Sequence, residues 1–248
     1  MSERVWDSFL TEQDKAAVAV KAHRGVGAGS RPALLLIDLY RWVFGDKPQP
    51  LPEQVREWPS GCGPAAWEAL PHIQRLLAVA REVGIPVVHM TWLNADGLHG
   101  WSEAAHQEAP PQPEPDAAAA DRKRRAWDIV DEVAPQPGEL VLRKSSPSAF
   151  WGTPLVGHLR FHDIDTLVVA GESTSGCVRA SVVDGCTNRF RMMVVEEGVF
   201  DRHEAPHAIN LFDMNQKYAD VVSVEEAIGY LRRIQAERAG AKEMVRAR

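Results

Sequence analysis

The chain has 248 residues, of which 45% are hydrophobic and 25% charged, and its formal net charge is −6. A chain of this length can bury a substantial core without disulfides, and its acidic balance argues against a nucleic-acid partner. Three cysteines are too few for a disulfide framework or a zinc cluster, and no apolar run approaches the roughly 20 residues of a membrane helix. The N-terminus lacks a basic stretch followed by an apolar one, so we expect a cytoplasmic protein without a membrane partner.

The polar residues 1–31 are interpreted as an N-terminal arm, either packed on a partner subunit or frayed, ahead of a single domain over residues 32–248. Apolar runs then alternate with helical patterns. The predicted strands are Ala33–Ile37, Val87–Met90, Leu140–Leu142, Thr166–Ala170, Met192–Glu196 and Ala219–Val222. The predicted helices are Trp67–Val83, Leu155–Phe161, 177–189 and 224–239. Continuous apolar strands between helices predict an α/β fold, with a parallel sheet covered on both faces.

Two irregular excursions, 45–64 and 94–128, interrupt this alternation. The middle of the second, APPQPEPDAAAA, is expected to be a surface loop or a lid. The short basic run Arg122–Arg125 is flanked by Asp121 and Asp128, which indicates a solvent-facing helix surface rather than a phosphate site.

Three reactive side chains stand at equivalent places in this pattern. Asp38 ends the first strand, Lys144 ends the third, and Cys177 follows the fourth. Each alone has an ordinary structural explanation: a turn cap, a solvent-facing lysine or a small buried hydrophobe. Because the carboxyl ends of parallel strands form one crevice, their joint placement favours a site. Cys177 is expected in the first turn of a helix, where the dipole and free N–H groups would lower its thiol pKa.

Each residue type suits one role in acyl transfer. Asp38 can take the thiol proton and return it to a leaving amine, while Lys144 holds both groups in position. Amides of the Ser173–Cys177 loop can stabilise an oxyanion, and Gly176 lets the backbone pass close to the nucleophile.

The order Asp…Lys…Cys and the segments ALLLIDLY, RKSSPSAFWGTPLVGHL and VVAGESTSGCVRASVVDG resemble the cysteine hydrolases of the isochorismatase-like superfamily. Within it, STSGCVRASVVD and FDRHEAPHAINLFDMNQKYADV are most similar to N-carbamoylsarcosine amidases. The resemblance covers about residues 32–228. It implies a Rossmann-like, doubly wound six-stranded sheet, a homodimer or homotetramer, and the triad Asp38, Lys144 and Cys177. It also implies a cis Glu172–Ser173 peptide that turns the Ser173 N–H toward the oxyanion, beside that of Cys177.

Several residues are candidates for substrate binding. Glu172 replaces an expected small residue, and its carboxylate either receives a substrate amine or points into a polar contact. In the resembled amidases an arginine in the segment of Arg202 can hold a substrate carboxylate; the alternative is a salt bridge to Asp201 or Glu204. Aromatic residues near strand ends could wall a pocket or belong to the core: Trp42, Phe44, Trp92, Trp101 and Trp151.

No cofactor and no metal are expected. Asp38 is not followed by the D-x-H start that nicotinamidases of the superfamily carry. Metal-ligand spacing is also missing from the histidines His89, His99, His106, His203 and His207.

The resemblance therefore predicts a cofactor-independent amidohydrolase that acts on a small linear amide, in particular an N-carbamoyl compound, through a covalent intermediate on Cys177. Two alternatives stay open. One is vinyl-ether hydrolysis of the isochorismatase type, which needs no thiol, and the other is a non-catalytic, partner-binding member of the superfamily.

Overall fold

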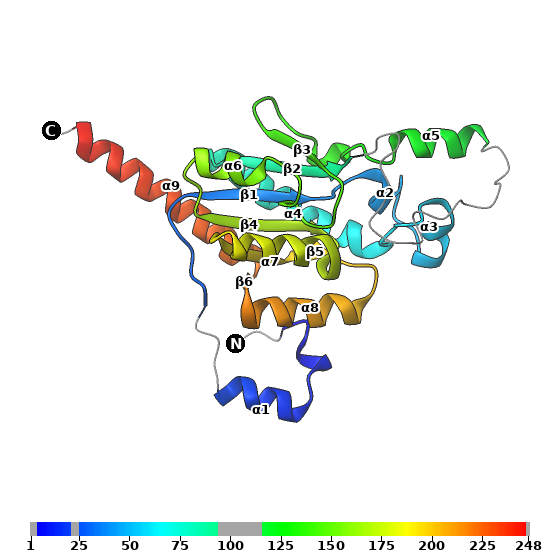
Figure 1. Ribbon diagram of the computed structural model, residues 1–248, viewed down its shortest axis with the longest axis horizontal. Coiled ribbons are helices and arrows are strands. Elements are labelled where there is room, and N and C mark those ends of the chain that lie inside the picture. Colours follow the sequence, from blue (N-terminus) through cyan, green and yellow to red (C-terminus); the bar gives the residue numbers. More distant parts are fainter. Residues whose placement is uncertain (1–3, 21–24, 94–115, 247–248) are drawn as a thin grey trace.

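The computed structural model describes residues 4–20, 25–93 and 116–246 (Figure 1). Its centre is a six-stranded sheet in the order β3-β2-β1-β4-β5-β6, and every neighbouring pair is parallel. The strands are β1 (Pro32–Ile37), β2 (Val87–Trp92), β3 (Leu140–Lys144), β4 (Thr166–Glu172), β5 (Arg191–Phe200) and β6 (Ala219–Val222). The predicted parallel α/β sheet is confirmed. Strand order reverses between β1 and β4, and open α/β sheets bind ligands at such a switch point.

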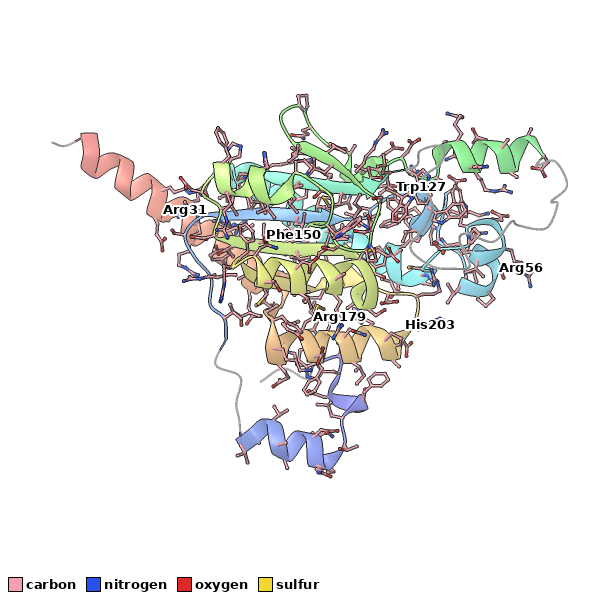
Figure 2. All side chains as sticks on the ribbon, in the orientation of Figure 1. Arg31, Arg56, Trp127, Phe150, Arg179 and His203 are labelled. Atoms are coloured by element: carbon pink, nitrogen blue, oxygen red, sulfur yellow. The ribbon has the colours of Figure 1, made fainter. Side chains whose placement is uncertain are left out.

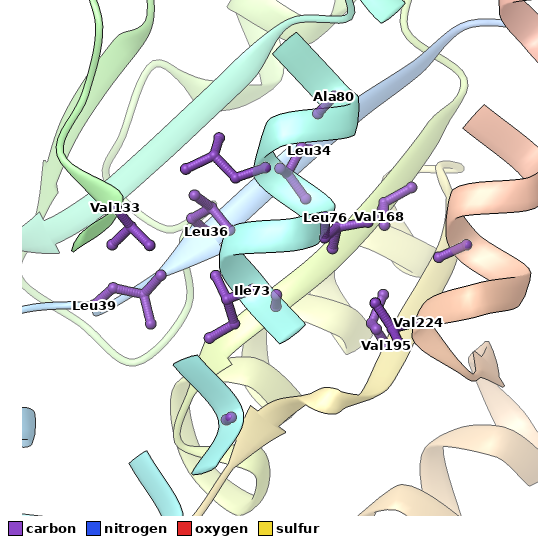
Figure 3. Close-up of a cluster of buried hydrophobic side chains, with 14 of the residues drawn as sticks. Leu34, Leu36, Leu39, Ile73, Leu76, Ala80, Val133, Val168, Val195 and Val224 are labelled. Carbon is purple, nitrogen blue, oxygen red and sulfur yellow. The ribbon is translucent and has the colours of Figure 1, made fainter. Parts of the chain in front are cut away.

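Helices cover both faces of the sheet. On one face lie α4 (Pro64–Val83) and α9 (Val224–Arg246), and on the other α6 (Leu155–Phe161), α7 (Arg179–Thr187) and α8 (Glu204–Lys217). Each face of the sheet carries its own hydrophobic core, and successive residues of β1 point into the two cores alternately. Leu34 and Leu36 pack with α4, whereas Leu35 and Ile37 pack on the opposite side. Figure 3 shows the first core, between the sheet, α4 and α9. Both faces of β1 are therefore buried, which explains its uninterrupted apolar sequence.

The helix predicted over Trp67–Val83 begins three residues earlier, at Pro64. Gly63 precedes it, and a proline is well tolerated in the first helical turn, where its missing N–H has no partner to lose. Gly84 ends the helix in the left-handed region, with φ 70°. The apolar stripe of α4 is fully buried at Ile73, Leu76 and Ala80.

Several elements differ from the sequence prediction. The excursion 45–64 contains α3 (Leu51–Glu57), and the short α2 (Arg41–Phe44) lies just before it. The excursion 94–128 includes α5 (Ala117–Arg125), whose last turn holds the basic run. The helix α8 was not predicted, because only a narrow stripe of it is buried: Ala208, Leu211 and Met214. The segment proposed as a loop or lid, 94–120, ends in the first turn of α5. Its part over 94–115, with Trp101, His99 and His106, lies outside the described residues, so a lid stays a prediction.

The N-terminal segment packs on its own chain. It contains a 3₁₀ turn, η1 (Asp7–Phe9), and α1 (Glu12–Val20), which lies beyond α8 in Figure 1. Trp6 is buried and contacts Phe212 of α8 at 6.3 Å between ring centroids. Arg4 pairs with Glu196 at 2.5 Å. No helix of the described residues is both long and apolar enough to cross a bilayer.

Candidate active site

The structure brings together the three side chains that the sequence places at strand ends. Lys144 Nζ lies 2.7 Å from Asp38 Oδ2 and 3.2 Å from Cys177 Sγ. The side chains of Asp38 and Lys144 are both 0% exposed, so this ion pair has almost no solvent screening. A thiol, a carboxylate and an ammonium therefore share one buried cluster.

The strands bring Asp38 and Lys144 into contact although β2 separates them. Asp38 follows β1 directly, and its N–H donates to Met90 O of β2 at 3.1 Å. Its φ of 57° lies in the left-handed region, which aspartate tolerates better than most residues. Lys144 is paired with Trp92 in the β2–β3 register, and its ammonium lies 5.3 Å from the centroid of that ring. The lysine therefore reaches over an aromatic ring to the carboxylate.

Cys177 lies in a π-helical turn, η4 (Thr174–Val178), rather than in the first turn of an α-helix over 177–189 as predicted. The α-helical hydrogen-bond pattern begins only at α7. The wider turn arises because Ser173 O accepts two N–H groups, those of Gly176 and Val178, each at 3.0 Å. A Cβ at Gly176 would lie 2.3 Å from Ser173 Oγ, so a side chain there would force that hydroxyl group to turn away. Single π turns occur often at functional sites.

Three contacts that sequence reasoning missed hold this turn. Thr174 Oγ1 and His207 Nδ1 are 2.8 Å apart, and the N–H of Ser175 donates to Asp201 Oδ2 at 2.7 Å. Ser181 Oγ donates to Cys177 O at 2.7 Å and accepts the N–H of Ala149 at 2.9 Å. The only signal in the sequence was the spacing of Ser181, four residues after the cysteine, which suits a bond to the carbonyl one turn earlier.

The expected cis peptide bond between Glu172 and Ser173 is present. Just before it, Gly171 has φ 121°, and a Cβ at this position would lie 2.0 Å from Ile37 O. Only glycine lets β4 approach β1 this closely, next to Asp38.

A cavity of about 280 Å³ opens at Cys177. It lies at the low end of the range of roughly 300–1,000 Å³ that is typical of ligand pockets, so it fits a small substrate. Its lining is formed by Tyr40, Trp42, Val43, Ser60, Trp92, Trp127, Pro147, Glu172, Ser173, Gly176, Cys177 and Arg202. Figure 2 shows Trp127 at the end of the sheet that carries α2. A larger cavity of about 570 Å³ shares Arg202 but not Cys177, so we assign the chemistry to the smaller one.

The candidate substrate residues divide into two groups. Glu172, Arg202, Trp42 and Trp92 line the cavity, whereas Trp151 is 65% exposed and is not part of the lining. Phe44 is a core residue, buried against Phe200 and Trp67.

Arg202 Nε donates to Gly61 O at 3.1 Å, and its guanidinium joins no ion pair within the described part of the chain. Sequence reasoning missed Tyr40 and Trp127 as lining residues. Tyr40 stands two residues after Asp38. Trp127 is held at the site by contacts with residues distant in sequence: Thr91 Oγ1 donates to Trp127 O at 2.8 Å, and a bridge joins Tyr40 to Ile129.

Burial dominates the electrostatics of the site. It raises the pKa of the Cys177 thiol; the Asp38 carboxylate raises this pKa further, and Lys144 opposes the shift. The expectation of a lowered thiol pKa is therefore wrong, because desolvation outweighs the cation. Burial also raises the pKa of Asp38, against the effect of Lys144. Although burial alone would lower the pKa of Lys144, the charges of Asp38 and Cys177 raise it, so the ammonium stays protonated.

Within the described residues, no group of three histidine, cysteine, aspartate or glutamate side chains is arranged to hold a metal ion. His89 contacts Glu139 at 3.0 Å, away from the cavity, and His203 and His207 line the larger one. The absence of a metal and of a cofactor stays a prediction.

Fold and site together define an α/β protein of Rossmann-like topology with an enclosed thiol–carboxylate–ammonium cluster. The chain belongs to the isochorismatase family: the model of the isochorismatase domain matches residues 32–226. The resemblance drawn from the sequence motifs is thus confirmed.

Two relatives cover most of the chain. The maleamate amidohydrolase of Pseudomonas putida is 38% identical over 214 residues, which are 84% of this chain and 91% of that protein. The N-carbamoylsarcosine amidase of an Arthrobacter species is 33% identical over 90% of this chain and 81% of that protein.

Solved structures agree on the fold. The isochorismatase family protein of Desulfovibrio vulgaris matches with a TM-score of 0.65 and 26% identity, over 81% of this chain and 98% of that one. The N-carbamoylsarcosine amidase of Thermoplasma acidophilum matches with a TM-score of 0.59 and 22% identity, over 78% of this chain and 96% of that one.

Proposed function

We propose that this protein is a cysteine-dependent amidohydrolase that cleaves a small linear amide, in particular an N-carbamoyl (ureido) compound, and releases ammonia. The observation that carries the proposal is the cluster behind the cavity wall at Cys177, where Lys144 lies 2.7 Å from Asp38 and 3.2 Å from Cys177. The names of both relatives, an amidohydrolase and an amidase, support action on the C–N bond of small amides.

The first half of the reaction forms a covalent bond to sulfur. Cys177 Sγ attacks the carbonyl carbon while its proton passes to the Asp38 carboxylate. Because burial raises the pKa of the resting thiol, the proton must move as the C–S bond forms. The N–H groups of Ser173 and Cys177 stabilise the negative oxygen, and one such donor is worth about 3 kcal/mol of barrier.

The second half releases both products. Asp38 gives its proton to the amide nitrogen, the C–N bond breaks, and ammonia departs. The acyl group stays on sulfur as a thioester, or as a thiocarbamate where the substrate is a ureide. Asp38 then takes a proton from water while the water oxygen attacks the same carbon. The C–S bond breaks, and the Cys177 sulfur regains the proton from Asp38. Lys144 keeps Asp38 ionised between these steps. The charge on Asp38 is therefore the same at the start and end of each turnover.

Ammonia release tests this proposal. Wild type, Cys177→Ala and Cys177→Ser are assayed with carbamoyl amino acids, maleamate, biuret and nicotinamide. We expect wild type to turn over at least one of these amides, and each Cys177 variant to lose activity at least about a thousandfold while keeping its fold. Cys186→Ser is the matched control, because Cys186 is a free, half-buried thiol on α7 outside the cavity. Unchanged turnover in the Cys177 variants would remove the proposal.

The two alternatives give different results. A vinyl-ether hydrolase would work without the thiol and would form no adduct, so intact-protein mass spectrometry should detect an acyl or carbamoyl mass on Cys177 only in an amidase. A non-catalytic member would show neither ammonia release nor an adduct.

A further inference from the structure

Glu172 is a buried acid that forms no ion pair within the described part of the chain. It is the last residue of β4, is 8% exposed, and lines the cavity together with Cys177. Its Oε1 faces the Cys62 thiol at 3.7 Å, and the carboxyl group joins no ion pair among the residues that the structure describes. A buried carboxylate usually requires a charged or well hydrogen-bonded partner. Among the described residues the carboxyl group accepts only the weak Cys62 thiol donor and forms no ion pair, while it borders the cavity that Cys177 lines.

Arg202 lines the same cavity but does not neutralise Glu172. Its Nε is directed to Gly61 O at 3.1 Å, and no ion pair joins the two side chains. The two residues come near each other because Glu172 pairs with Phe200, the last residue of β5, and Arg202 follows two residues beyond that strand end. The cavity therefore presents an acid and a guanidinium that are not paired to each other.

The remaining walls suit a cation. Four aromatic side chains line the cavity: Tyr40, Trp42, Trp92 and Trp127. The Trp92 ring already has the Lys144 ammonium 5.3 Å from its centroid. Aromatic faces attract ammonium groups, most strongly at desolvated positions.

We propose that Glu172 is a specificity-determining residue that binds a positively charged nitrogen of the substrate, with Arg202 binding a carboxylate of the same molecule. The preferred substrate is then a small zwitterionic amide or ureide: a reacting carbonyl group on a skeleton that carries both an ammonium and a carboxylate. This inference rests on the proposed amidohydrolase function. It concerns which amide is chosen, not how the C–N bond is broken.

The protonation of Glu172 gives a second line of support. Burial, together with the charges of Asp38 and Asp201, raises its pKa to about 8, and Lys144 and Arg202 only partly oppose this. Glu172 is therefore mostly the neutral acid at neutral pH, and an arriving ammonium must displace its proton. The affinity for an ammonium substrate should rise with pH up to about 8, the pKa of Glu172. The groups around it that titrate or carry charge are Asp38, Tyr40, Cys62, Lys144, Cys177, Asp201 and Arg202.

The test compares three ureides with one skeleton: 2-amino-3-ureidopropanoate, 3-ureidopropanoate, which lacks the ammonium, and (2-aminoethyl)urea, which lacks the carboxylate. Wild type should prefer the first over the second at least tenfold in kcat/KM, mainly through KM. Glu172→Gln should lose that preference and its pH dependence while still hydrolysing the ammonium-free ureide. Glu68→Gln is the charge-matched control, because the exposed Glu68 lines only the larger cavity.

Calorimetry with Cys177→Ala gives a readout without turnover. Binding of 2-amino-3-ureidopropanoate near pH 7 should release a proton, and the additional Glu172→Gln change should abolish that release. Preference for 3-ureidopropanoate, or a preference that survives in Glu172→Gln, overturns the role of Glu172 but leaves the amidohydrolase standing. If no ureide or amide, maleamate included, is hydrolysed by wild type, the proposed function itself fails, and this inference fails with it.

Discussion

Lys144 reaches Asp38 across an intervening strand: their side chains meet at 2.7 Å, although β2 separates β3 from β1 in the sheet. Both side chains are fully buried, so neither can turn to solvent if the other is lost. The pair is therefore structural as well as chemical.

Lys144→Met should destabilise the fold by about 3–5 kcal/mol, because it leaves Asp38 buried without its cation. The double variant Asp38→Asn/Lys144→Met should recover part of this loss but no activity. Urea unfolding measures the free energy of unfolding of the single and the double variant. As a control, Arg41→Met breaks the pair of Arg41 with Asp131, whose side chain is 92% exposed, and should cost less than about 1 kcal/mol. Equal losses in the two single variants would contradict the prediction.

Asp38→Asn should separate thiol ionisation from catalysis. The Asp38 carboxylate raises the pKa of Cys177 and Lys144 lowers it. The variant should therefore alkylate Cys177 at lower pH than wild type, yet lose amide hydrolysis by about 10²–10⁴-fold, since no group carries the proton to the leaving amine. The pH profile of iodoacetamide labelling checks the first part. A shift of that profile to higher pH would show that Asp38 serves mainly to form the thiolate.

Gly171→Ala should unfold the protein or lower its stability by several kcal/mol, because the new Cβ would lie 2.0 Å from Ile37 O at a φ of 121°. Gly84→Ala is the comparison: φ is 70° there and no atom lies within 4 Å, so only the left-handed backbone costs energy, about 1–2 kcal/mol. In thermal unfolding, Gly171→Ala should therefore melt at a clearly lower temperature than Gly84→Ala. Similar melting temperatures would mean that β4 can move away from β1.

Thr174→Val should slow turnover without weakening substrate binding. Thr174 Oγ1 lies 2.8 Å from His207 Nδ1 and holds the turn that carries Cys177. Loss of a buried hydrogen bond costs about 1–3 kcal/mol. We expect this loss to misplace Cys177 and to lower kcat about tenfold, with KM unchanged. Thr187→Val removes an equivalent hydroxyl that bonds Val183 O on the exposed side of α7. If both threonine variants behave alike, the contact with His207 does not position the nucleophile.

The sequence predicted the features that depend on local pattern. The buried strands are continuous apolar runs, so the ends that carry Asp38 and Lys144 could be located, and parallel topology implied that they meet. The helix α8 was missed because its buried stripe, Ala208, Leu211 and Met214, is too narrow to stand out.

Other features depend on tertiary contacts. The direction of the Cys177 pKa shift was predicted wrongly, because it depends on how deeply the cavity walls bury the sulfur. Trp127 is held at the site by long-range contacts, among them the bridge between Tyr40 and Ile129 and the hydrogen bond from Thr91 Oγ1 to Trp127 O, which no periodicity reveals. The π turn at Cys177 likewise follows from two N–H groups that share Ser173 O.

Two adjacent positions at the end of β4 differ in their tolerance of substitution. Gly171 admits no side chain, because the backbone oxygen of Ile37 occupies that space. Residue 172, next along the chain, points a long side chain into the cavity wall. A library that aims at new substrates should therefore leave 171 untouched and randomise 172, where a new side chain changes the chemistry of the cavity wall.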